Sequence, residues 1–343
     1  MAEGQGSIFD GMAPIPERTV SSAEALDRLL LEARQPFVVR GLVEHWPLVA
    51  AGKASAQTAQ EYLLAKHQDR QFVVSVGPSE ARGRQFYQAD MAMNVKTGRA
   101  KLPEIFRQIQ ASEDQPEQPI IYCASIDVRG FFSGLHEANH VDLGDRTCLA
   151  SIWMGTRSRI AAHNDFPSNL ACVAVGHRRF TLFPPDQFRN LYLGPVDNTP
   201  AGRAVSMVDF HAPDFARYPR FQAALQSALV ATLAPGDAIY IPSMWWHHIE
   251  GLNPFNVLVN YWWRETPRHL GQPQDALNHA MMAIRDLPPA EKQHWRDLFE
   301  HYVFDNTDEV AAHIPEAARG VLGPMTAETA SKMRSFLLRS LSQ

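Results

Sequence analysis

Short apolar runs fill the middle of the chain, and helical apolar periods dominate its C-terminal part. Between about Ile120 and Trp263 the runs are separated by glycine, proline and aspartate; they are Cys148–Met154, Leu170–Val175, Phe180–Phe183, Ala238–Ile241 and Phe255–Trp262. Strands of this length and spacing are typical of an antiparallel sandwich or barrel. We therefore expect a mainly β core.

The region from Ser21 to about Gln110 mixes helical and strand patterns. Ser21-Ser22-Ala-Glu24 predicts the start of a helix, because an early serine followed by glutamate suits an N-terminal cap. The segment from Pro36 to Gly41 predicts a short strand that ends at a glycine.

From about Pro273 the apolar residues recur at three- and four-residue steps, which predicts helices. Pro289 suits the first turn of one helix, and a last amphipathic helix is expected after Thr326. The apolar stripes can pack on the β core or on a second copy of the chain, and we predict a homodimer. The predicted organisation is an N-terminal α/β region (1–119), a β core (120–265) and a helical region (266–343).

Composition narrows the function classes. The chain has 343 residues, of which 45% are hydrophobic and 20% charged, as in globular proteins. Its formal net charge of −5 disfavours nucleic acid as the main partner. The three cysteines are widely spaced, which suits a reducing compartment. No apolar run suggests a signal peptide or the roughly 18 residues of a membrane helix, so a cytoplasmic location is expected.

Two segments far apart in the chain carry candidate metal ligands. His163-Asn-Asp165 can offer an imidazole and a carboxylate to one ion, because residues i and i+2 of a strand share a face. Downstream, Pro235-Gly-Asp237 precedes a β-run that leads to His247-His248. Two histidines and one carboxylate form the facial triad of iron(II) oxygenases. His140-Val-Asp142 and His248-Ile-Glu250 also fit a His-x-acid pattern, and the first of these reads as a loop.

The surrounding motifs resemble a known family. They run in order over about 100 residues: His163-Asn-Asp165-Phe-Pro-Ser-Asn169, Gly176-His-Arg178-Arg-Phe-Thr-Leu-Phe-Pro184, Pro235-Gly-Asp237, Tyr240-Ile-Pro242, Trp245-Trp-His247-His248-Ile-Glu250 and Val259-Asn260-Tyr-Trp262. This stretch is similar to the cupin-like branch of the jumonji-C oxygenases, in particular to their asparaginyl hydroxylases. The resemblance implies a double-stranded β-helix (jelly-roll/cupin) core with N-terminal α/β elements and a C-terminal helical tail.

The resemblance also assigns roles to individual residues. It implies that His163, Asp165 and His247 bind Fe(II), with His248 on the opposite face of its strand making a structural hydrogen bond. The implied co-substrates are 2-oxoglutarate and O2. Arg178 stands at the position where the family often has a lysine for the far carboxylate of 2-oxoglutarate. The other residues matched to the co-substrate pocket are Tyr122, Asn169, Asn260 and Trp262.

One position departs from the family pattern. Ile160 replaces a hydroxyl residue three positions before the first histidine, which removes one hydrogen bond worth about 1 kcal/mol. Arginine at position 178 is chemically adequate, because it pairs with a carboxylate bidentately.

The implied reaction is hydroxylation of an amino-acid side chain in a protein or peptide. Two alternatives remain at this stage. One is the same chemistry on a small molecule, a tRNA base or a methyl-lysine. The other is a catalytically silent metal-binding cupin that acts as a binding or scaffold protein.

Overall fold

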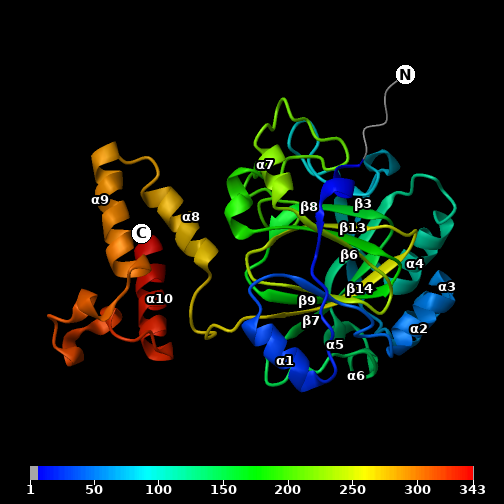
Figure 1. Cartoon of the computed structure of the whole chain (residues 1–343), viewed down its shortest axis with the longest axis horizontal. Coiled ribbons are helices and arrows are strands. Elements are labelled where there is room, and N and C mark those ends of the chain that lie inside the picture. Colours follow the sequence, from blue (N-terminus) through cyan, green and yellow to red (C-terminus); the bar gives the residue numbers. More distant parts are fainter. Residues whose placement is uncertain (1–6, 343) are drawn as a thin grey trace. The chain divides into compact units, whose positions relative to one another are not determined.

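Two β-sheets pack face to face in the first of two units into which the chain folds (Figure 1). The computed structural model describes residues 7–342; the first unit ends at Trp263 and the second begins at Arg264. In order across the six-stranded sheet, the strands are β1 (Ala13–Pro14), β11 (Leu229–Leu233), β10 (Arg178–Phe183), β13 (Trp246–Gly251), β8 (Ser158–Asn164) and β4 (Arg84–Gln85). In order across the eight-stranded sheet, they are β2 (Phe37–Val39), β12 (Ala238–Ile241), β9 (Ser168–Val175), β14 (Asn256–Trp263), β7 (Leu149–Gly155), β6 (Ile120–Asp127), β3 (Gln71–Gly77) and β5 (Lys96–Lys101).

The space between the sheets is an apolar core at one end. Phe180 and Leu182 from β10 meet Val173, Ile239 and Leu258 from the opposite sheet, and all five are buried. Alternate residues of each strand point into this space, because successive side chains of a strand face opposite sides. The mainly β core with helical additions, predicted from the sequence, is confirmed.

Helices cover the outer face of the eight-stranded sheet (Figure 1). They are α1 (Ala23–Glu32), α2 (Pro47–Ala54), α3 (Ala56–Lys66), α4 (Leu102–Ala111), α5 (Val128–Phe131) and α6 (Leu135–Ala138). The start of α1 is as predicted, because the Ser22 hydroxyl accepts a hydrogen bond from the Ala25 amide at 3.2 Å. On the six-stranded sheet, α7 (Phe221–Gln226) packs against outward residues such as Phe183 and Trp246.

Strands β8 and β13 pair antiparallel with one irregularity. His247 lies opposite His163, and Ile249 lies opposite Ile160. Two steps along β13 therefore match three steps along β8, so Ala161 and Ala162 form a bulge. Because of this extra residue, both His163 and Ile160 face the interior of the sandwich.

The second unit contains α8 (Pro273–Ala283), α9 (Pro289–Phe299) and α10 (Ala327–Leu341); a short turn joins α8 to α9, and a longer connection with several single helical turns joins α9 to α10. Pro289 is the first residue of α9, and the Thr326 hydroxyl caps α10 by accepting from the Thr329 amide, both as predicted. No residue of α8 or α9 is buried, and Ala330 is the buried residue of α10. Over the described residues, no helix combines the length and the apolarity that crossing a bilayer requires.

Candidate metal centre

Three predicted ligands meet at the adjoining ends of β8 and β13. The imidazoles of His163 and His247 lie side by side with ring centroids 4.4 Å apart. Asp165 follows the last residue of β8 and places a carboxylate oxygen 3.6 Å from Nε2 of His247. One ligand atom from each residue lies within 4.8 Å of the other two, a spacing that one metal ion can bridge. The set of two imidazoles and one carboxylate suits non-haem iron(II).

The backbone orients both imidazoles. Nδ1 of His163 lies 2.9 Å from the carbonyl oxygen of Ala161, and Nδ1 of His247 lies 3.0 Å from that of Trp245. An Nδ1–H that donates to a carbonyl leaves the Nε2 lone pair free for a metal. The two rings are thus held in the tautomer that a metal ligand requires.

Burial and the neighbouring charges set the ionisation of the three groups. Burial, with a smaller contribution from His247, lowers the pKa of His163 to about 4. Burial by itself would raise the pKa of Asp165, but the neighbouring His247, His163 and Arg203 together lower it to about 2. At neutral pH His163 is therefore unprotonated and Asp165 ionised, which are the forms that bind a divalent cation.

The same shifts predict acid sensitivity of the metal-free protein. A histidine whose pKa is lower in the folded than in the unfolded state favours unfolding as pH falls from about 6.5 toward 4, because the unfolded chain binds the proton more tightly. His163 and His248 both have pKa values near 4, mainly through burial. We expect the Tm of the metal-free protein to fall steadily between pH 7 and pH 4.5, as measured by differential scanning fluorimetry. The variant His248→Gln should show a weaker dependence, and a Tm independent of pH would contradict the shifts.

His248 lies on the opposite face of β13, as predicted, but its predicted hydrogen bond is not found. Its ring packs against Phe210 with centroids 4.5 Å apart. Within residues 7–342 neither ring nitrogen has a hydrogen-bond partner, and Nε2 is 3.9 Å from Glu250. His248 is therefore held by packing and by the field of a buried carboxylate. The stretch around His140-Val-Asp142 is irregular backbone, as expected of a loop.

Alternation along β10 separates the two adjacent arginines. Arg178 is 1% exposed and faces the sandwich interior, on the same side as Phe180. Arg179 faces outward, where Nε donates to Glu250 at 2.6 Å and the guanidinium stacks on Phe9. Among the described residues no carboxylate pairs with Arg178 in this way; its partner is the Tyr122 hydroxyl.

The remaining candidates lie on the face of the eight-stranded sheet that points into the sandwich. Asn260 Nδ2 donates to Asn169 Oδ1 at 3.1 Å, and Trp153 Nε1 donates to Asn260 Oδ1 at 2.8 Å. The Trp153 ring lies between the rings of Tyr122 and Trp262, with centroid distances of 6.3 and 5.6 Å. Trp153 was not singled out from the sequence, although it occupies an inward position of a predicted strand. The five candidates and Trp153 thus form one connected group.

Several buried donors in this group lack an acceptor. Arg178 Nε and Nη2 and Trp262 Nε1 have no hydrogen-bond partner among the described residues. Buried donors are almost always paired in folded proteins, so unpaired ones indicate a missing partner. A dicarboxylate bound beside the metal ligands would supply acceptors and neutralise the guanidinium, so the residues present fit 2-oxoglutarate. Ile160 lies opposite Ile249 and adds an apolar wall without a donor.

A further cation lies near the metal ligands. Arg203 stacks on Phe166, the residue after Asp165, with its guanidinium 3.8 Å from the ring centroid. Its charge contributes to lowering the pKa of both His163 and Asp165. No sequence pattern pointed to Arg203, because it lies in a long irregular connection.

Comparison with known proteins places the site in a family context. The cupin-like domain family matches residues 23–269. HSPB1-associated protein 1 from rat is 30% identical over 152 residues, which cover 42% of this chain and 30% of that protein. Lysine-specific demethylase JMJ31 from Arabidopsis thaliana is 32% identical over 134 residues, covering 37% and 24%. The human bifunctional peptidase and (3S)-lysyl hydroxylase JMJD7 is 25% identical over 259 residues, covering 67% and 77%. The chain spans about a third or less of the length of the first two of these relatives.

Proposed function

The chain belongs to the cupin-like, jumonji-C family of Fe(II)- and 2-oxoglutarate-dependent oxygenases, and we propose that it hydroxylates an amino-acid side chain of a protein or peptide. Members of this family use Fe(II), 2-oxoglutarate and O2. The observation that carries the proposal is the pairing of His163 with His247 beside Asp165, together with Arg178, buried and unneutralised on β10, the strand that pairs with β13. A relative named as a (3S)-lysyl hydroxylase, matched over two thirds of this chain, supports the choice of a peptide substrate.

Each group in the interior has a role that its chemistry allows. His163, Asp165 and His247 would hold the iron, and Arg178 with Tyr122 would bind the far carboxylate of 2-oxoglutarate. Asn169, Asn260 and Trp262 would line the co-substrate and exclude water. When bound, iron with 2-oxoglutarate and O2 supplies the oxidant that converts a C–H bond into an alcohol, with release of succinate and CO2.

Anaerobic titration with Fe(II) and 2-oxoglutarate tests the proposal. We expect a weak visible charge-transfer band that requires both components, because 2-oxoglutarate would chelate a metal held by the triad while Arg178 adds affinity for its far carboxylate. Absorbance spectroscopy under argon measures it, with succinate as the control ligand. Metal binding without such a band would support the scaffold alternative instead.

Demethylation is a second candidate, because two relatives are named as lysine-specific demethylases. Hydroxylation adds one oxygen to a peptide, whereas demethylation removes a methyl group and releases formaldehyde. Mass spectrometry of peptides incubated with the protein therefore distinguishes the two reactions.

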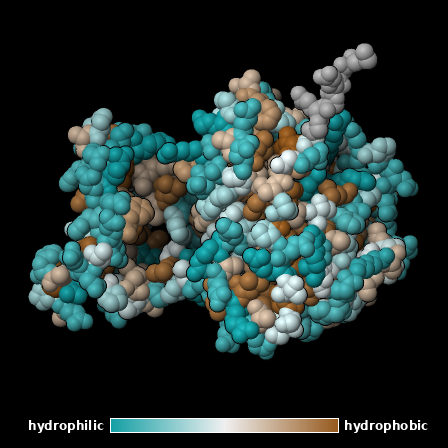
Figure 2. Space-filling model, viewed as in Figure 1, coloured by the Kyte–Doolittle hydropathy of each residue, from teal (hydrophilic) through white to brown (hydrophobic). Residues whose placement is uncertain are grey.

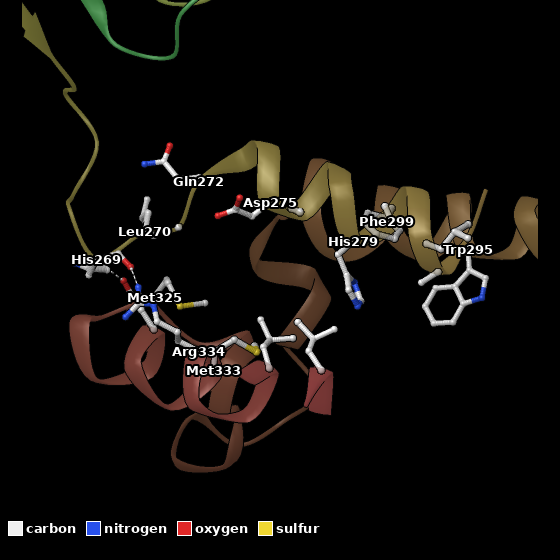
Figure 3. Close-up of a pocket in the computed structure, with 18 of the residues that line it drawn as sticks. His269, Leu270, Gln272, Asp275, His279, Trp295, Phe299, Met325, Met333 and Arg334 are labelled. Atoms are coloured by element: carbon white, nitrogen blue, oxygen red, sulfur yellow. Dashed lines mark hydrogen bonds between the residues drawn. The ribbon is translucent and has the colours of Figure 1, made fainter. Parts of the chain in front are cut away.

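We also propose that the second unit forms a homodimer. Figure 2 shows apolar side chains along the concave side of this unit, and Figure 3 shows His279, Trp295, Phe299 and Met333 around a pocket between α8, α9 and α10. The pocket measures about 910 Å³. Because no residue of α8 or α9 is buried, these helices lack a closed core of their own. The apolar side chains that remain exposed on these helices favour association with a second copy.

Charge on the pocket side of α10 should separate the two copies. Leu337 and Leu341 line the pocket and are 42% and 54% exposed. We expect light scattering to give twice 38.4 kDa for the unaltered chain and about 38.4 kDa for Leu337→Asp/Leu341→Asp. Ser331→Asp/Ser335→Asp adds the same charge to another face of α10 and should remain dimeric. A mass near 38.4 kDa for the unaltered chain at micromolar concentration would reject the dimer.

A further inference from the structure

A second cavity, outside the metal centre, combines aromatic rings with arginines. It measures about 740 Å³, and its lining includes Phe188, Arg189, Tyr192, Arg217, Tyr218 and Arg220. The rings of Tyr192 and Tyr218 meet edge to face with centroids 5.1 Å apart and form part of the floor. All three arginines are exposed. We call this cavity the arginine groove.

The guanidinium group of each of these three arginines lies over an aromatic ring. Arg220 lies 4.4 Å from the Tyr192 ring, Arg217 lies 5.2 Å from Tyr218, and Arg189 lies 5.3 Å from Phe188. Arg220 also donates from Nε and Nη2 to the carbonyl oxygen of Arg189, at 3.2 and 3.0 Å. The guanidinium group of Arg220 is thus positioned before any ligand binds, which reduces the entropy lost on binding.

No carboxylate of the described chain neutralises these arginines. Within residues 7–342 none of the three takes part in an ion pair. The two acidic residues nearest in sequence are engaged elsewhere: Asp186 accepts from the Gln187 side chain, and Asp214 accepts from the Arg217 backbone amide. Three guanidinium groups around one cavity, none of them in an ion pair with a described residue, form a site for an anionic partner.

The groove adjoins the strand that carries the metal ligands. Met207 lines the groove, and the amide of its neighbour Ser206 donates to the carbonyl oxygen of Ala162 at 2.7 Å. Ala162 directly precedes His163. Tyr192, whose carbonyl accepts from the Met207 amide, has φ of 50°, an unusual conformation for a non-glycine residue. The groove and the metal ligands are therefore joined through the backbone of β8, with the groove beside the outer face of the six-stranded sheet.

We propose that the arginine groove binds an acidic segment of the protein substrate, flanking the residue that is hydroxylated. The inference rests on the proposed function for its substrate, but the groove itself is defined by charge and shape. Arginine pairs bidentately with aspartate and glutamate, and the aromatic floor packs against the stems of their side chains. A short acidic segment suits the groove better than nucleic acid, because a few carboxylates can match three arginines, whereas a phosphate backbone carries a charge at every nucleotide beyond them.

Fluorescence anisotropy with a labelled twelve-residue Asp/Glu-rich peptide tests the proposal on the full chain. We expect the affinity for the peptide to fall as salt is added. The affinity should also fall by about 10- to 100-fold in Arg189→Gln/Arg217→Gln/Arg220→Gln, since each exposed ion pair contributes modestly. The matched control is Arg28→Gln/Arg99→Gln/Arg107→Gln, which removes the same charge from exposed positions elsewhere and should bind as the unaltered chain does.

Three outcomes would overturn the proposal. They are no binding of the acidic peptide, an equal loss in both triple variants, or tighter binding of a single-stranded RNA dodecamer than of the peptide through the same arginines. The assay needs neither iron nor 2-oxoglutarate. Its failure therefore leaves the charge-transfer test of the oxygenase untouched, and failure of that test leaves the groove untouched. Retention of iron binding in the variants shows that they are folded.

Discussion

Replacing His163 or His247 with alanine is expected to abolish iron binding and turnover, whereas His248→Ala retains measurable iron affinity. His163 and His247 supply two of the three ligand atoms that meet within 4.8 Å, and their Nε2 lone pairs face the same point. A site left with one imidazole and one carboxylate loses most of its affinity for a divalent transition metal. His248 points to the other side of β13, toward Phe210.

Iron content after anaerobic loading and desalting, measured by atomic emission, checks this prediction. His248→Ala creates a cavity beside Phe210 and is expected to lower the Tm. Circular dichroism therefore checks that each variant is folded. Iron loss in His248→Ala combined with retention in His247→Ala would assign the ligand to the other histidine of the doublet.

Arg178→Met is expected to raise the 2-oxoglutarate requirement by about 30- to several-thousand-fold while leaving iron affinity nearly unchanged. Truncating one partner of a buried charge pair costs about 2–5 kcal/mol, because the other charge is left unpaired. Arg178 is 1% exposed, and its Nε and Nη2 atoms have no hydrogen-bond acceptor among the described residues. Succinate formation followed against co-substrate concentration gives the change.

A thermal measurement separates this role from a structural one. Without co-substrate, Arg178 is a buried cation whose partner is a neutral phenol, so Arg178→Met should not lower the Tm of the metal-loaded protein. The rise in Tm that 2-oxoglutarate produces should disappear in the variant. Arg179→Lys is the control, since it keeps a cation beside Glu250 on the outer face. A similar loss of co-substrate affinity in Arg179→Lys would contradict the assignment.

The alternation of residues along the strands predicts which of these side chains face the interior of the sandwich. Alternation along the run that begins at Arg178 correctly sends Arg178 inward and Arg179 outward, and the same rule separates His247 from His248. These predictions succeed because each strand packs one face on a core and so has a single workable register.

Other features depend on contacts that no local pattern encodes. The bulge at Ala161 and Ala162 turns Ile160 inward, although strict alternation from His163 would turn it outward. Glu250 is 2% exposed because Arg179 and His211, distant in sequence, both bind it. Arg203 and the arginine groove lie on long connections, where neither period nor capping signals apply.

The backbone hydrogen bonds to His163 and His247 have a consequence for apo-protein behaviour. Each ring is oriented by the carbonyl oxygen of the residue two positions earlier, Ala161 for His163 and Trp245 for His247. The backbone carbonyl of Asp165 accepts from the Met244 amide at 2.9 Å. The backbone therefore orients both imidazoles and anchors the residue that carries the carboxylate once β8 and β13 pair. Zinc fingers behave in the opposite way, since they unfold when a chelator removes their metal. In this protein chelation should withdraw the ion from a rigid site, which then reloads without refolding.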